Sequence, residues 1–543
     1  MKYLTTNLKD FVDCVDSGAT PIDSADFSMR PGFNEKVLRR VHTYLSMLDL
    51  DSILSESNLP LKLKSSIRFH IKFFLTKKFF IEELEEISGL QVWPPRKNPK
   101  FRLGLYKIVP HWIVALIRYS GGFFSLLVFK YFLAINKGSL SRRILVFSAS
   151  NGLAYAVGKL IMNRDVVYFR SVRTSFFAKI SEFLRYRETL PFFPLLLFDT
   201  SQPYDGNIFR PGCCASCDFE NELRVLIHNW IDVRLFELNC IEVLVRTLQP
   251  KVFFAQHSLD CAATIAIVCH RESIPTVLAS HGSHVLSDSS IAVKEWIDHS
   301  KTMLDGPFDF TLVQTPAAAA FADIVQPTPS VVRTAPILFG PKENSSDACR
   351  NKVFHSSAGD TIFLYASTPK SLDFLRPVIY ESEDEYVRNL KVFLECVAGN
   401  PQIHVAVRHR PSNGLPIHLI EQIVSRYSFA KVYSQGDFDD LVKCCDVLVS
   451  YSSTAIEQAL FYGKYVLSWS VNAEYHHLKV DYSAAFRGIY YANRKELSGV
   501  ILKILHSVRM GTFHGDMDLQ REYYLYLEEH KKSASALRNL FGD

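Results

Sequence analysis

A hydroxyl-rich turn follows a short apolar run near the carboxyl end of the chain. The run Val447–Ser450 is expected to be a buried strand, and a helix is expected over Ala455–Tyr462, closed by Gly463. Between them stand four hydroxyl side chains, namely Tyr451, Ser452, Ser453 and Thr454. Thr454 and Glu457 have the spacing of a capping box, which would fix the helix start. The first amides of such a helix carry positive partial charge, so the turn suits a phosphate, although an ordinary capped helix has the same pattern.

Basic side chains follow two further apolar runs in the same part of the chain. The expected strand Ile403–Arg408 ends in Arg408-His409-Arg410, and arginine can bind a phosphate through two parallel hydrogen bonds. The expected strand Thr361–Ala366 leads to Thr368 and Lys370, which could contact phosphate or sugar. Charged residues in an exposed loop would give the same sequence pattern. The apolar strands that precede them favour a ligand-binding face.

Histidines end two expected strands in the middle of the chain. His281 and Gly282 follow the strand Thr276–Ala279, and a histidine there can act as a general base near neutral pH. The strand Val252–Ala255 is followed by three rival candidates for the base, namely Gln256, His257 and Asp260. A purely structural histidine is the alternative for His281.

Short apolar runs alternate with helical segments of about a dozen residues from position 143 onward. This alternation predicts βαβ units and parallel sheets. The expected fold class is α/β, with two Rossmann-like, doubly wound domains that face a cleft. We expect a helical region over 1–140, a first Rossmann-like domain over 141–340 that takes the acceptor, and a second over 341–543 that binds a nucleotide-sugar. Ligands of such sheets bind beyond the carboxyl ends of the strands.

The composition is that of an ordinary globular protein. Of 543 residues, 48% are hydrophobic and 22% charged, which excludes general disorder, and a net charge of +5 gives no argument for nucleic acid. The 11 cysteines form no framework, and the CCxxC cluster Cys213, Cys214 and Cys217 lacks the second ligand pair of a zinc site. No signal peptide is expected, so the chain is predicted to be cytoplasmic with reduced thiols.

The first 140 residues could dock to a membrane or to the rest of the chain. Six basic residues lie in a stretch rich in Phe and Ile: Lys62, Lys64, Arg68, Lys72, Lys77 and Lys78. Such a stretch can lie on an anionic membrane surface, or it can be a solvated helix face. The apolar segment 112–135 contains Arg118 and Lys130, so an interfacial or buried helix pair is preferred over a membrane span. The expected location is peripheral, at the inner face of the membrane.

Residues from about 250 to 470 resemble two-domain GT-B glycosyltransferases that assemble bacterial capsule and lipopolysaccharide. The likeness rests on 274–282, on 310–316, and on the motifs 408–411 and 452–457, which resemble the "HP" and "SS/ST…E" motifs of sialyl-, Kdo- and glycerophosphate-transferring enzymes. The resemblance implies that Ser452, Ser453 and Thr454 hold the phosphates of a CMP- or other NDP-linked donor, that Glu457 orients the helix start or reaches donor hydroxyls, and that His281 is the base. The chain departs from the pattern at Arg410, where the family has histidine. Arginine can bind phosphate but cannot act as an acid near neutral pH.

The resemblance implies an enzyme that transfers a sugar to a growing polysaccharide or lipid-linked acceptor. Neither a metal nor a cofactor is expected, because arginines and a helix start would stabilise the leaving phosphate. Two alternatives stay open. One is a nucleotide-sugar 2-epimerase with the same architecture, and the other is a non-catalytic subunit of a polysaccharide assembly complex, which the arginine at position 410 favours.

Overall fold

The computed structural model describes most of the chain. The described residues are 2–5, 20–30, 32–48, 59–92, 143–147, 166–169, 189–190, 216–279, 290–336, 359–372, 375–400, 402–410, 415–451, 453–470 and 489–510, with a few single residues between them. His281, Ser452, Cys213, Cys214 and most of 112–135 lie outside this set.

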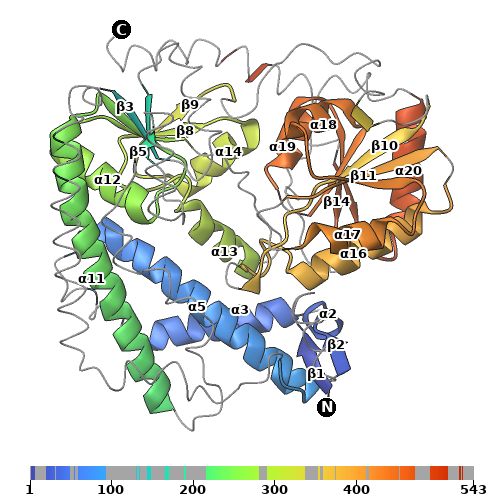
Figure 1. Cartoon of the computed structure of the whole chain (residues 1–543), viewed down its shortest axis with the longest axis horizontal. Coiled ribbons are helices and arrows are strands. Elements are labelled where there is room, and N and C mark those ends of the chain that lie inside the picture. The colour runs from blue at the N-terminus through green and yellow to red at the C-terminus, as the bar shows by residue number, and fades with distance from the viewer. Residues whose placement is uncertain are drawn as a thin grey trace.

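Two parallel sheets confirm the expected α/β class (Figure 1). The first contains β3 (Ile144–Phe147), β4 (Val166–Phe169), β5 (Thr189–Leu190), β6 (Val252–Ala255), β7 (Thr276–Ala279), β8 (Phe310–Val313) and β9 (Ser330–Arg333). The second contains β10 (Thr361–Tyr365), β11 (Ile403–Arg408), β12 (Ala430–Tyr433), β13 (Val447–Ser450), β14 (Tyr465–Trp469) and β15 (Ile489–Ala492).

Both sheets have the strand order of a Rossmann fold. The first runs β5-β4-β3-β6-β7-β8-β9, and the second runs β12-β11-β10-β13-β14-β15. Renumbered within each sheet, the order is 3-2-1-4-5-6, with a seventh strand added at the end of the first sheet, and it places a topological switch point between the first and fourth strands. That point lies between β3 and β6 in one sheet and between β10 and β13 in the other, where Phe363–Tyr365 pair with Val447–Val449.

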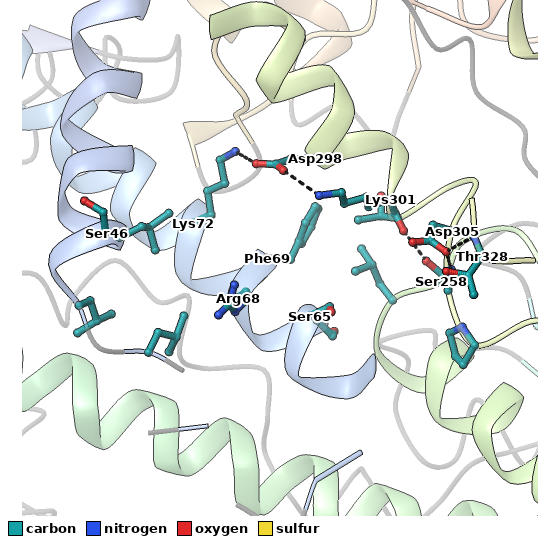
Figure 2. Close-up of a pocket in the computed structure, with 18 of the residues that line it drawn as sticks. Ser46, Ser65, Arg68, Phe69, Lys72, Ser258, Asp298, Lys301, Asp305 and Thr328 are labelled. Carbon is teal, nitrogen blue, oxygen red and sulfur yellow. Dashed lines mark hydrogen bonds and ion pairs between the residues drawn. The ribbon is translucent and has the colours of Figure 1, made fainter. Parts of the chain in front are cut away.

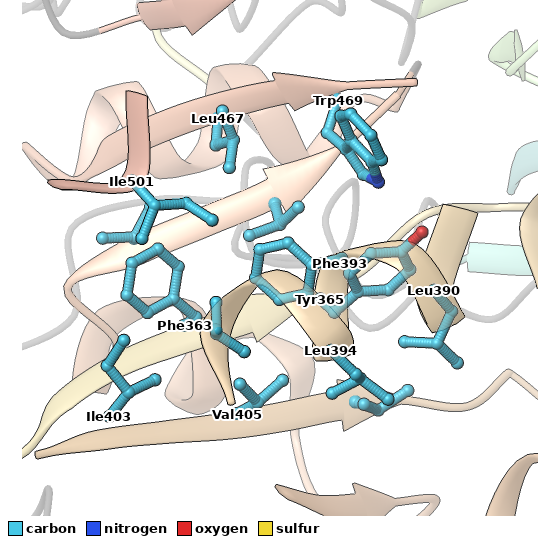
Figure 3. Close-up of a cluster of buried hydrophobic side chains, with 14 of the residues drawn as sticks. Phe363, Tyr365, Leu390, Phe393, Leu394, Ile403, Val405, Leu467, Trp469 and Ile501 are labelled. Atoms are coloured by element: carbon cyan, nitrogen blue, oxygen red, sulfur yellow. The ribbon is translucent and has the colours of Figure 1, made fainter. Parts of the chain in front are cut away.

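The strands of the second sheet are apolar because both of its faces are buried. Ile362 and Leu364 pack on one face with helices α18 (Phe438–Cys444) and α19 (Ala455–Phe461). Their neighbours Phe363 and Tyr365 point to the other face, towards α16 (Glu383–Val397), α17 (Ile417–Val424) and α20 (Leu497–Arg509) (Figure 3). Because successive side chains of a strand point to opposite faces, one apolar strand contributes to a hydrophobic core on each side of the sheet.

The first sheet is covered in the same way. Leu145, Phe253 and Leu278 pack against α11 (Ser216–Leu248) and α12 (Asp260–Arg271). Val313 packs against α14 (Pro316–Val325). A further helix, α13 (Ser290–Ser300), lies between the two sheets in Figure 1.

The amino-terminal region is helical, as expected, with one correction. Helices α2 (Ala25–Ser28), α3 (Phe33–Met47) and α5 (Leu61–Ser88) dominate it, but β1 (Lys2–Thr5) and β2 (Thr20–Asp23) form a small parallel sheet. Apolar residues at helical spacing had indicated helices alone. These two strands are short and, apart from Leu4 and Thr5, largely exposed, so neither presents a long apolar run that periodicity could detect.

Helix α5 joins this region to both Rossmann-like parts. Lys72 pairs with Glu295 and Asp298 of α13 at 2.6 and 2.7 Å. Arg376, from the segment after β10, lies over the Phe69 ring of α5 at 4.0 Å. At the amino end, Arg388 of α16 pairs with Asp23 at 3.0 Å. Of the two docking modes considered for this region, the structure shows docking to the rest of the chain.

Candidate functional site

The switch point of the second sheet brings two of the expected loops together. The backbone N–H of Tyr451, after β13, donates to the Ser367 hydroxyl, after β10, at 2.9 Å. The N–H of Ala366 donates to the Val449 carbonyl at 2.9 Å. Loops 366–370 and 451–454 are therefore neighbours at the edge where ligands of such sheets bind.

Lys370 and Arg410 place two cations at this edge. Burial lowers the pKa of Lys370, and the positive charge of Arg410 lowers it further. The pKa of Arg410 is lowered by burial and then by Arg408. Lys370 lies over the Tyr380 ring at 5.1 Å and Arg410 over the Phe438 ring at 5.7 Å, but within the described chain neither pairs with a carboxylate. Such cations are favourable sites for an anion, because an added negative charge would relieve their repulsion.

Arg408 was predicted to bind phosphate, but its guanidinium is engaged with backbone carbonyls. Its guanidinium donates to the carbonyls of Gln435 at 2.9 Å and Gly436 at 3.2 Å. These bonds hold the loop between β12 and α18. Its charge still contributes to the positive field at Arg410.

His409 lies buried behind the cations. Its Nε2 is 2.8 Å from the Leu415 carbonyl, an acceptor, so this nitrogen carries the proton. The Nδ1 atom is buried and has no partner among the described residues. The hydrogen bond from His409 to Leu415 therefore connects the loop after β11 to the segment just before α17. Thr368 lies half-buried on the same loop as Lys370.

The turn before α19 differs from the expected capping box. Thr454 is the N-cap residue but makes no side-chain cap bond, and the Ser453 hydroxyl accepts the N–H of Ala455 at 3.2 Å instead. Glu457 is buried, and its Oε1 accepts a hydrogen bond from the Thr315 hydroxyl at 2.5 Å. Because Thr315 precedes α14 of the first part, Glu457 links the two Rossmann-like parts. A capping box is a local pattern, and here the glutamate has a partner 142 positions away.

Asp260, one of the two residues expected to be catalytic, lies in a buried network. Its carboxylate accepts from the Ser66 hydroxyl at 2.8 Å, lies 2.7 Å from His70 Nε2 and pairs with Arg234 at 3.1 Å. Burial alone would raise the pKa of Asp260, but Arg234 and the two hydrogen bonds hold it far below its usual range. A carboxylate held so firmly in its ionised form is a poor proton acceptor, so the geometry gives Asp260 a structural role between α5, α11 and α12.

His257 lies at the switch point of the first sheet. Its ring meets the Phe147 ring edge to face at 5.6 Å, and Nδ1 accepts the N–H of Leu259 at 3.3 Å. Burial lowers the pKa of His257 more than Asp260 raises it, which favours the neutral imidazole. Its Nε2 makes no hydrogen bond to a described residue. Because Nδ1 accepts a hydrogen bond, the proton of the neutral ring lies on Nε2, so this nitrogen is a donor and His257 cannot act as a general base in this tautomer.

A cavity of about 780 Å³ opens between the amino-terminal helices and the first Rossmann-like part (Figure 2). The end of α3 and one side of α5 form one wall, including Leu48, Ser65 and Phe69. The opposite wall comes from the loop after β6 and from the segment between α13 and β8. Sequence reasoning missed this cavity, because its walls come from five segments that carry no common motif, the fifth being Thr328 between α14 and β9.

The basic stretch of α5 is partly neutralised within the protein. Lys72 pairs with two carboxylates of α13, and Lys78 contacts Glu82 one turn away. Among the described residues no helix is long and apolar enough to cross a bilayer.

No family model matches the sequence, and no curated protein matches it. Several solved structures share features of the fold at low identity. A glycotransferase of kitacinnamycin is 11% identical, with a TM-score of 0.43 over 74% of this chain and 99% of its own. The glycosyltransferase SnogD from Streptomyces nogalater is 12% identical, with a TM-score of 0.43 over 74% and 100%. A putative UDP-N-acetylglucosamine 2-epimerase from Listeria monocytogenes is 10% identical, with a TM-score of 0.44 over 74% and 97%. At these scores the fold assignment rests on the strand order of the two sheets.

Proposed function

We propose that this protein is a glycosyltransferase that takes a sugar from a nucleotide-activated donor. The observation that carries the proposal is the pair Lys370 and Arg410, two half-buried cations at the edge of the second sheet that have no carboxylate partner among the residues the structure describes. A pyrophosphate between them would replace mutual repulsion by two charge-assisted bonds. The same contacts would stabilise negative charge on the leaving phosphate.

The remaining residues take roles around this anion site. Thr368, Ser452, Ser453 and Thr454 lie on the two loops of the switch point and would offer hydroxyls to the donor. Arg408, His409 and Glu457 would shape the site, the first two by fixing the loop after β11 and the third by joining the two parts. An acceptor hydroxyl would lose its proton to His281.

The acceptor is proposed to be a surface polysaccharide or a lipid-linked saccharide, handled at the inner face of the membrane. The six basic residues in the aromatic-rich stretch 62–78 support this location. Transfer without a metal ion is part of the same proposal, because cations of the chain would carry the charge of the leaving group.

A panel of CMP, CDP, UDP, GDP and TDP tests the donor site by thermal shift. At least one nucleotide should raise the melting temperature of the wild-type protein, since a ligand that binds only the folded state stabilises it. Lys370→Met and Arg410→Met should lose this rise. Lys391→Met, which changes an exposed lysine of α16, is the matched control and should keep it.

The donor-site proposal fails if no nucleotide shifts the wild-type protein, or if the two variants respond as the control does. Product analysis then separates the enzymatic classes. An epimerase converts the nucleotide-sugar without an acceptor, whereas a transferase releases nucleotide only when an acceptor is present. A protein that binds nucleotide and does neither would be a non-catalytic subunit.

A further inference from the structure

The cavity beside α5 has no role in the donor site. Its walls include six hydroxyl side chains from both sides: Ser46, Ser65, Ser66, Ser258, Thr302 and Thr328. Four apolar residues from α3 and the segment after it lie on one side, namely Leu45, Met47, Leu48 and Leu50, and Leu259 from the loop after β6 lies on the other. At about 780 Å³ it lies within the usual size range of small-molecule sites.

The charges around the cavity are balanced within the protein. Asp298 pairs with Lys72 at 2.7 Å and with Lys301 at 3.8 Å, as Figure 2 shows. Asp305 Oδ1 accepts the N–H groups of Gly306 at 2.9 Å and Thr328 at 3.0 Å. Lys72 and Lys301, two of the three cations of the lining, are thus paired with carboxylates, and the third, Arg68, also has an interaction within the protein, so a neutral, polar ligand suits the cavity better than a strongly anionic one.

One aromatic ring is fixed in the wall. Phe69 lines the cavity, and the Arg376 guanidinium lies over its ring at 4.0 Å. Arg376 is buried, and Phe73 holds it from a second side at 4.9 Å. A ring held in this way can present a rigid surface to the C–H groups of a ligand.

Hydroxyl groups, balanced charges and a fixed aromatic ring together match the surface of a sugar, which has polar edges and apolar C–H faces. A lipid chain would need a continuous apolar lining, whereas serines and threonines interrupt this one on both sides. We propose that the cavity binds a neutral saccharide of a few rings. That this saccharide is the acceptor rests on the proposed transferase function.

The position of the cavity supports the acceptor assignment. Ser258 lines it, and the preceding residue is His257, the neutral histidine at the switch point of the first sheet. A saccharide at this wall would therefore lie beside the carboxyl end of β6, the edge at which ligands of such sheets bind. The amino-terminal helices would then complete an acceptor site that the two Rossmann-like sheets alone do not form.

Binding of maltotriose, mannotriose, galactotriose and chitotriose to the full chain tests the proposal by calorimetry. Ser65 is exposed on the cavity wall, so Ser65→Trp should fill the space and weaken binding at least tenfold. Ser498→Trp places the same side chain on α20, outside the cavity lining, and should leave binding unchanged. Thr328→Trp blocks the opposite wall and replaces Ser65→Trp if that variant does not fold.

The outcomes separate this inference from the proposed donor site. Saccharide binding that is lost in Ser65→Trp while the nucleotide thermal shift persists would support it. The inference is overturned if no trisaccharide binds, if both cavity variants bind as the control does, or if they lose only binding to phosphatidylglycerol vesicles. If Lys370→Met loses the nucleotide thermal shift but still binds the saccharide, the result supports the donor site and shows that the two sites are independent.

Discussion

The Thr315 hydroxyl makes two buried hydrogen bonds that connect the two Rossmann-like parts. It accepts the N–H of Ala318 at 3.1 Å, which caps α14, and donates to Glu457 Oε1 at 2.5 Å. Only 3% of Thr315 and 2% of Glu457 are exposed, so water cannot replace a lost bond easily. Removing this hydroxyl therefore tests both the cap and the contact between the parts.

Thr315→Val keeps the shape of the side chain and removes the hydroxyl. Loss of the cap should lower the free energy of unfolding by about 1 kcal/mol. Loss of a hydrogen bond to a charged group should lower it by a further ~1.5–3 kcal/mol. The expected total is therefore about 2.5–4 kcal/mol. Thr315→Ser keeps both bonds and loses one buried methyl group, so it should cost only about 0.8 kcal/mol.

Urea denaturation of the two variants and the wild type measures these differences, and native-state hydrogen exchange of α14 and α19 shows whether both helices are affected. Pairing Thr315→Val with Glu457→Gln in a double-mutant cycle isolates the contact between the parts. The reasoning is refuted if Thr315→Val is no less stable than Thr315→Ser. It is also refuted if exchange quickens in α14 alone, since the bond to Glu457 would then contribute nothing.

Three further substitutions have expected outcomes. Gly306→Ala should lower stability by about 1–3 kcal/mol in thermal unfolding, because its φ is 153° and a Cβ would lie 2.5 Å from the Ser258 Cβ. Asp260→Asn should cost about 1.5–3 kcal/mol at neutral pH, because it removes the charge of the carboxylate that accepts from Ser66, contacts His70 and pairs with Arg234. The folded-state pKa of Asp260 is depressed, so the stability difference should shrink as the pH falls below the unfolded value of about 4. Burial raises the pKa of Glu381 to about 7, so the wild type should lose stability as the pH rises from the unfolded value of about 4 towards 7. In urea titrations across the same pH range, the free energy of unfolding of Glu381→Gln should fall by about 3 kcal/mol less than that of the wild type.

Much of the two sheets could be predicted from local sequence. Strands β6, β7, β11 and β13 lie at the expected residues, and β10 and α19 each end one residue before the expected end. Each is a short apolar run or an amphipathic segment bounded by polar or turn residues, and such patterns report burial directly. The parallel order also followed from the alternation of strands and helices. The long helix α11 was not anticipated.

The site was predictable only in part. Lys370 and Arg410 lie together because both follow strands of one parallel sheet, and position after a strand is a property that sequence shows. The bonds of Arg408, Glu457 and Asp260 were not predictable in this way. Glu457 meets Thr315 across the two parts, and Asp260 meets Ser66 and His70 of α5.

The sequence by itself determined which segments are strands and helices and which polar residues follow the strands, because hydrophobic periodicity acts over a few neighbouring residues. Only the tertiary structure decided which of those polar groups have partners and which are left for a ligand. The cavity beside α5 shows the same division, since its lining comes from segments more than 200 positions apart in places, from Leu45 to Thr328. A hydrogen bond or ion pair depends on two groups approaching within a few ångströms, and that approach is set by how distant segments pack.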